Sequence, residues 1–96
     1  MGHRIELGEI ETYMNAIEGL LRSCCIFDTD ENKILGFFEI EGASELDRKG
    51  VTHALKDIVP QWMNPNVLVK VETMPITKNG KIDRKELMKI YKEQEA

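Results

Sequence analysis

Apolar residues recur along this chain with two different spacings, and the changes of spacing mark the boundaries of the predicted elements. Between residues 9 and 22 they lie three or four positions apart, which is the pattern of one face of a helix. The runs "SCCIFDT" at 23–29 and "ILGFFEIE" at 34–41 are typical of strands, and the polar "DENK" between them suits a hairpin. The first half therefore predicts a helix followed by two paired strands.

The second half of the chain continues this alternation. Ser44 follows a strand-breaking glycine and is a suitable first residue for a helix, which Pro60 should end or kink. The apolar stripe of that helix consists of Val51, Ala54, Leu55, Ile58, Val59 and Trp62. Residues 66–72 then predict a third strand, whose alternate positions share one face and carry Val67, Val69 and Val71.

A last helix is predicted over residues 84–93. Asp83 and Glu86 have the spacing of a capping box, and the packing side consists of Leu87, Ile90 and Tyr91. The resulting fold class is α+β: a small, about three-stranded and mainly antiparallel sheet flanked by helices. With 96 residues, the chain has the size of a single domain.

Composition restricts what such a domain can do alone. At 42% hydrophobic and 31% charged residues it should fold, but it leaves little room for a pocket of roughly 300 Å³. This favours a module that works against a partner. No apolar run approaches the roughly 20 residues of a membrane span, so no membrane association is expected. The initial "MGHRIELGEIE" is charged where a signal peptide would be apolar, and we expect a cytoplasmic protein.

Two cysteines, Cys24 and Cys25, are adjacent in a predicted strand. A disulfide between neighbours would be strained, so we expect two buried thiols, which suits a reducing cytosol. The two histidines, His3 and His53, have no ligand spacing relative to these cysteines, and no metal site is predicted.

Charge is distributed unevenly. The net charge is −4, yet residues 78–92 carry six basic and two acidic side chains, a local +4. The six are Lys78, Lys81, Arg84, Lys85, Lys89 and Lys92. Arg84 and Lys85 in the first helical turn oppose the helix dipole, which favours an anion or an acidic surface facing this segment. A solvated helix face is the alternative for the helix lysines. The acidic balance elsewhere argues against nucleic-acid binding.

The segment "MPITKNGKIDRKEL" at residues 74–87 contains a predicted turn with a candidate functional residue, Lys81. Asn79 and Gly80 predict a sharp turn, since glycine allows a positive φ, and the turn projects Lys81 outward. Taken alone, Lys81 is either an exposed turn lysine or an ammonium group delivered to a phosphate or carboxylate.

Two segments resemble the last two core motifs of the adenylate-forming ligases, which include nonribosomal peptide synthetase adenylation domains, acyl-CoA synthetases and luciferases. They are "GHRIELGEIE" at 2–11 and the turn segment at 74–87, and "VPQWMNPNVLVKVETMP" resembles the stretch that connects them. The resemblance covers nearly the whole chain. It implies a mobile C-terminal lid subdomain over residues 1–96, with the hinge and the large N-terminal ATP- and substrate-binding domain absent.

The resemblance also implies roles for the turn. Lys81 corresponds to the lysine that bridges the substrate carboxylate and the phosphate oxygens while ATP activates the acid. Thr77, Asn79 and Gly80 would shape the loop. Lys78 matches a variable position, and we predict that it is solvated.

After adenylation, subdomains of this family rotate and present another face to a pantetheine thiol. By this resemblance, the backbone at Gly2 would approach the thiol channel, and Arg4 would contact a phosphate or an acidic group. Pairing of Arg4 with Glu6 or Glu9 is the structural alternative.

The resemblance therefore implies an ATP-dependent, AMP-forming ligase that transfers an acid to a thiol. ATP and Mg²⁺ would be bound mainly by the absent N-terminal domain, so the isolated chain should be inactive. The acceptor is either the phosphopantetheine of a carrier protein or coenzyme A. "RIELGEIE" favours amino-acid activation. The competing hypothesis is a standalone binding module that docks an acidic carrier protein or another anionic partner.

Overall fold

The computed structural model describes residues 7–42, 44–61 and 64–95. Among these residues it contains three helices and three strands. In chain order they are α1 (Leu7–Asn15), β1 (Leu20–Asp28), β2 (Lys33–Ile40), α2 (Arg48–Ile58), β3 (Val67–Lys70) and α3 (Arg84–Glu95). The predicted order of elements and the α+β class are confirmed.

The strands form one sheet in the order β1-β2-β3. A hairpin joins β1 to β2, which pair antiparallel with Cys24 opposite Phe37. In contrast, β3 pairs parallel to β2, with Gly36 opposite Leu68. Parallel neighbours need a crossover connection, and α2 lies in that connection. The sheet is therefore mixed, with its longer pairing antiparallel.

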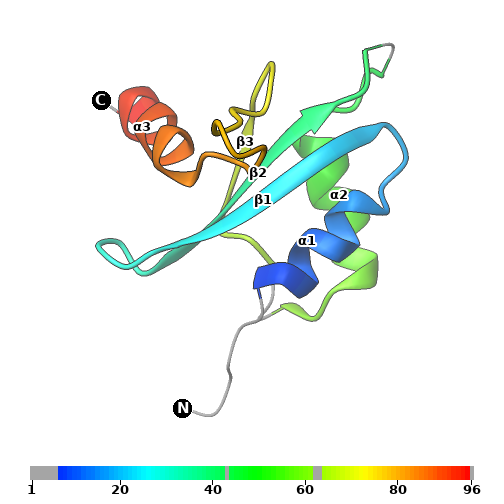
Figure 1. The fold of residues 1–96 in the computed structure, drawn as a ribbon. Helices are drawn as coiled ribbons and strands as arrows, with labels where there is room; N and C mark the ends of the chain where they lie inside the picture. The colour runs from blue at the N-terminus through cyan, green and yellow to red at the C-terminus, as the bar shows by residue number, and fades with distance from the viewer. Residues whose placement is uncertain (1–6, 43, 62–63, 96) are drawn as a thin grey trace.

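Helices cover both faces of this sheet. Figure 1 shows α1 and α2 on one face and α3 on the other. Side chains of alternate strand residues enter two separate cores. The first core consists of Ile10, Met14, Leu20, Cys25, Ile34, Phe38, Val51, Leu55, Val59 and Leu68. The second core, on the α3 side, consists of Cys24, Leu35, Phe37, Val69, Val71, Met74, Leu87 and Tyr91.

Because they are neighbours in one strand, Cys24 and Cys25 point into different cores, and both thiols are free and buried. The prediction of two buried thiols is confirmed. Burial raises the pKa of the Cys24 thiol from 9.0 to about 11, where Arg84 opposes the shift. Burial, assisted by Glu11, raises the pKa of Cys25 to about 12.

These pKa values predict a loss of stability in alkali. Above about pH 9 the unfolded chain releases the thiol protons that the folded chain still holds, so the free energy of unfolding should fall as pH rises toward 11. Urea unfolding at pH 7.5 and pH 10 measures this loss. A Cys24→Ala, Cys25→Ala double variant should lose less between these pH values. An equal loss in both proteins would show that other groups cause it.

Several predicted boundaries are wrong. The first helix ends at Asn15 and not at 22, because the chain turns through Gly19, whose φ is +94°, and enters β1. Ser44 does not begin α2: its hydroxyl accepts the Leu46 N–H, while Asp47 caps the helix by accepting the Gly50 N–H at 2.9 Å. The third strand covers Val67–Lys70 and not 66–72, and the first strand begins at Leu20 and not at 23.

Other details of the helices agree with the sequence in part. Val59, directly before Pro60, is extended, and α2 ends at Ile58 as expected. Ile58, assigned to the buried stripe, is 43% exposed, and Trp62 lies outside the described residues. At α3, Asp83 Oδ1 accepts the Glu86 N–H at 3.1 Å, which confirms this part of the predicted cap.

Candidate functional site

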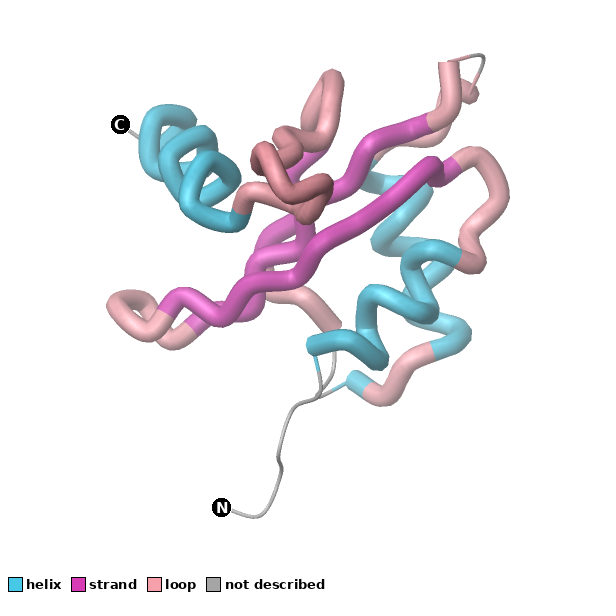
Figure 2. Tube along the Cα trace, in the orientation of Figure 1, coloured by secondary structure: helices cyan, strands magenta, loops and turns pink. Residues whose placement is uncertain are grey.

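The segment between β3 and α3 forms a tight turn on the α3 side of the sheet (Figure 2). Ile76 and Ile82 pair as an antiparallel bridge across its base. Within it the Thr77 N–H donates to the Lys81 carbonyl at 2.6 Å, and the Gly80 N–H donates to the Thr77 carbonyl at 3.0 Å. Gly80 has a φ of +85°, the left-handed conformation that glycine adopts without strain. The turn expected at Gly80 is therefore present.

A side chain also holds the turn closed. The Thr77 hydroxyl accepts the Lys81 N–H at 3.3 Å, so the backbone of the lysine is bonded on both sides to one residue. The Lys81 side chain is exposed, as are Lys78 and Asn79, and no ion pair joins Lys81 or Lys78 to a carboxylate within the described part of the chain. The Lys81 ammonium group is therefore accessible to a partner that contacts the turn.

The base of the turn is fixed to the sheet by a buried carboxylate. Glu39 on β2 is 8% exposed, and its Oε1 accepts the Met74 N–H at 3.0 Å. The same oxygen lies 3.0 Å from Nε of Arg22 on β1. On the other side of the base, the Asp83 N–H donates to the Pro75 carbonyl at 2.8 Å. These contacts form the platform on which the turn stands.

The anchoring role of Glu39 was not predicted, although its position in the sequence carries a signal. Glu39 shares its strand face with Leu35 and Phe37, both of which enter the second core. A carboxylate at a core-facing position must find partners when it is buried, and here these partners are Arg22 and the Met74 N–H.

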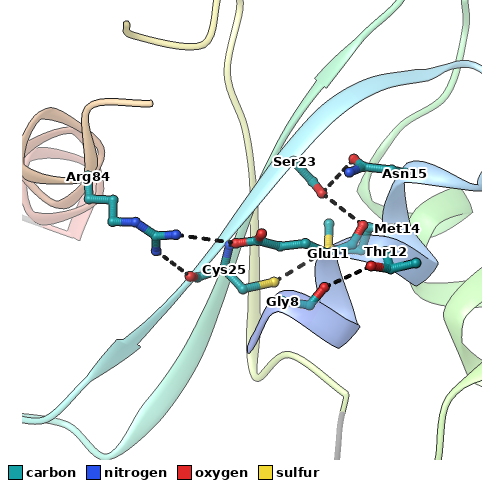
Figure 3. A network of polar contacts seen from close by, with 8 residues as sticks. All are labelled: Gly8, Glu11, Thr12, Met14, Asn15, Ser23, Cys25 and Arg84. Atoms are coloured by element: carbon teal, nitrogen blue, oxygen red, sulfur yellow. Dashed lines mark hydrogen bonds and ion pairs between the residues drawn. The ribbon is translucent and has the colours of Figure 1, made fainter. Parts of the chain in front are cut away.

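Arg84 has an internal partner, which changes the interpretation of the basic segment. Figure 3 shows its guanidinium at the outer edge of β1, where Nη1 donates to the Cys25 carbonyl at 2.9 Å. Glu11 of α1 reaches the same place: its Oε2 accepts the Cys25 N–H at 2.7 Å and lies 3.7 Å from Arg84 Nη2. We call these three residues the edge clasp. The anionic group that Arg84 faces is therefore the carboxylate of Glu11 in the same chain.

A second member of the basic segment is also paired internally. Lys92 Nζ lies 3.7 Å from Oδ2 of the buried Asp28. The remaining basic residues of this segment are exposed at the surface, namely Lys78, Lys81, Lys85 and Lys89. An anionic partner would therefore meet a smaller patch than the sequence suggests.

Two predicted site residues cannot be compared with the structure. Gly2 and Arg4 lie outside the described residues, so their assignment to a thiol channel or a phosphate contact stays a prediction. Within residues 7–42, 44–61 and 64–95, no three His, Cys, Asp or Glu side chains gather to hold a metal ion. None of the helices in those ranges has the length and apolar character to cross a membrane.

Comparison with known proteins identifies the relatives of this turn-bearing domain. No protein-family model matches the chain. It is 42% identical over 90 residues to zwittermicin A synthase ZmaJ of Bacillus cereus, covering 90% of this chain and 17% of that protein. It is 40% identical over 92 residues to surfactin synthase subunit 2 of Bacillus subtilis, covering 90% of this chain and 2% of that one.

The fold of this chain also occurs in a solved structure. ATP-bound MatB from Rhodopseudomonas palustris superposes with a TM-score of 0.81 at 21% identity, over 95% of this chain and 19% of MatB. The chain is a C-terminal subdomain of the adenylate-forming ligases. The family resemblance seen in the sequence is thereby confirmed. The subdomain spans less than a fifth of the length of these relatives.

Proposed function

We propose that this subdomain is the mobile lid of an ATP-dependent, AMP-forming ligase and that Lys81 supplies its adenylation chemistry. The observation that carries the proposal is the geometry of the turn. An exposed ammonium group stands on a glycine turn that Thr77 closes and Glu39 anchors.

The chemistry requires such a cation. A carboxylate oxygen of the acid attacks the α-phosphorus of ATP, the bond to the β-phosphate bridging oxygen breaks, and pyrophosphate leaves. Two anions approach each other, and negative charge spreads over the phosphate oxygens in the transition state. A preorganised cation at those oxygens lowers the barrier. Lysine suits this role as a compact point charge on a long stem.

The second half-reaction transfers the acid to a thiol. The thiolate sulfur attacks the carbonyl carbon of the acyl-adenylate, a thioester forms, and AMP leaves with the electron pair of the broken bond. The wording "RIELGEIE" of the first motif favours an amino acid as substrate, and we take the phosphopantetheine of a carrier protein as the acceptor. Coenzyme A is the alternative acceptor.

The rest of the site would belong to a large N-terminal domain of the same enzyme. The Lys81 ammonium group of the turn can donate hydrogen bonds to a phosphate oxygen of ATP. It has no lone pair and therefore cannot ligate Mg²⁺. We therefore assign Mg²⁺ and most contacts with ATP to that domain.

The test is reconstitution. The 96-residue chain alone should give no acid-dependent ATP–pyrophosphate exchange, because it supplies only the lysine. Addition of the separately expressed N-terminal domain of its enzyme should restore exchange above the level of that domain alone. Robust exchange from the 96-residue chain by itself would contradict the proposal.

A further inference from the structure

The two outer edges of the sheet differ in their protection. At the edge of β1, the edge clasp occupies both the N–H and the carbonyl of Cys25. At the outer edge of β3, no hydrogen bond to the strand backbone comes from any described residue outside β2. An unpaired strand edge is a template for another strand, and natural proteins usually cover it or use it.

The direction of the exposed groups follows from the ladder. The Val71 N–H donates to the Phe38 carbonyl of β2. In a parallel pairing alternate residues bond the same neighbour, so Val69 also points its backbone groups toward β2. The N–H and carbonyl groups of Leu68 and Lys70 consequently point to the outer edge.

A groove follows this edge and has helices as its walls. One part of it is lined by Val67 and Leu68 of β3 and by Arg48, Lys49 and Lys56 of α2. An adjoining part shares Arg48, Val67 and Leu68 and is also lined by Lys70 of β3 and by Tyr91 and Gln94 of α3. We call this feature the β3 groove. No aspartate or glutamate lines either part of it.

The charge of the β3 groove is uncompensated. None of its basic side chains forms an ion pair with a carboxylate among the described residues. Arg48 and Lys49 occupy the first turn of α2, where the partial positive charge of the helix end makes cations unfavourable. On a chain with a net charge of −4, this concentration of positive charge selects an anionic partner.

We propose that the β3 groove binds an extended acidic segment of another polypeptide, which adds to β3 as a fourth strand. Main-chain bonds to Leu68 and Lys70 supply the pairing, and carboxylates of the segment meet Arg48, Lys49 and Lys56. A second copy of this chain is a poor occupant, because pairing β3 with itself brings the same cations together across the new interface.

A peptide titration of the isotope-labelled chain, followed by NMR, tests this proposal. The probe is a ten-residue peptide of alternating glutamate and valine. It should shift the amide signals of Leu68 and Lys70 and slow their hydrogen exchange at least about tenfold. A lysine–valine peptide should bind at least about tenfold more weakly. So should the glutamate–valine peptide with a fully N-methylated backbone, which keeps the charge but cannot pair as a strand.

Matched protein variants complete the test. Arg48→Glu and Lys49→Glu should each weaken binding about tenfold while the fold is kept, because glutamate suits the first turn of a helix. Lys85→Glu, an equal charge change on α3 outside the groove, should leave binding unchanged. Equal binding of the N-methylated or the lysine peptide overturns the proposal, as does equal weakening by Lys85→Glu. Concentration-dependent shifts at Leu68 and Lys70 without peptide would identify a second copy as the occupant instead.

Discussion

Replacement of Lys81 by alanine in the intact enzyme should lower ATP–pyrophosphate exchange by about 10²–10³-fold. The turn holds the lysine backbone in place through Thr77, so the substitution removes the ammonium group and leaves the platform unchanged. Thioester formation from a preformed acyl-adenylate should survive, because the family resemblance implies that the subdomain has by then rotated and presents another face, so that Lys81 no longer faces the phosphate. Exchange of labelled pyrophosphate and single-turnover thioester transfer measure the two half-reactions separately.

Lys78→Ala is the matched control. Lys78 lies on the same turn, is equally exposed and loses the same charge, but precedes the glycine that directs Lys81 outward. Its exchange rate should stay within about twofold of the parent. If both variants retain full exchange, Lys81 is a surface lysine and docking of an anionic partner becomes the better account of this domain. If both variants lose exchange equally, net charge and not position is responsible.

Replacement of Glu39 by alanine should destabilise the domain and also impair adenylation. The buried Met74 N–H would lose its acceptor, which costs about 1–3 kcal/mol of unfolding free energy. The turn would lose its anchor to β2, so exchange should fall, while thioester transfer from a preformed adenylate should change little. Urea unfolding and the two half-reaction assays provide the readouts.

Two further variants separate anchoring from simple destabilisation. Glu39→Gln keeps an oxygen that accepts the Met74 N–H and should recover most of the stability and of the exchange rate. Glu41→Ala removes an exposed carboxylate near the end of the same strand and should have little effect. A Glu39→Ala enzyme that is less stable but exchanges normally would limit Glu39 to a structural role.

The parts of the fold that the sequence predicted well are those with local signals. The continuous apolar run of β2 marks a strand buried on both faces, and Asp83 with Glu86 marks the start of α3. The end of α1 was missed because Leu20 and Leu21 continue its helical spacing even though they lie in β1. The parallel direction of β3 has no local signal, since it depends on how α2 carries the chain back across the sheet.

The candidate site divides in the same way. The turn at Lys81 is a local motif, so its residues could be read from the sequence. The core-facing position of Glu39 was a signal, but its partner could not be predicted, because Glu39 and Met74 are 35 positions apart and meet only in the folded chain. The internal pairing of Arg84 was not predicted for a similar reason: its partners Glu11 and Cys25 lie on the first helix and the first strand, 59 or more positions away. Charge near a helix start cannot by itself distinguish an internal partner from an external one.

The edge clasp sets a mechanical condition on the proposed lid. Glu11 belongs to the first sequence motif and Arg84 to the second, and both form hydrogen bonds with the backbone of Cys25 in β1. Both motifs are therefore bonded to the same strand, and we expect them to move together with the sheet. If the two motifs serve successive half-reactions, the enzyme exchanges them by rotating the whole subdomain and not by bending its sheet.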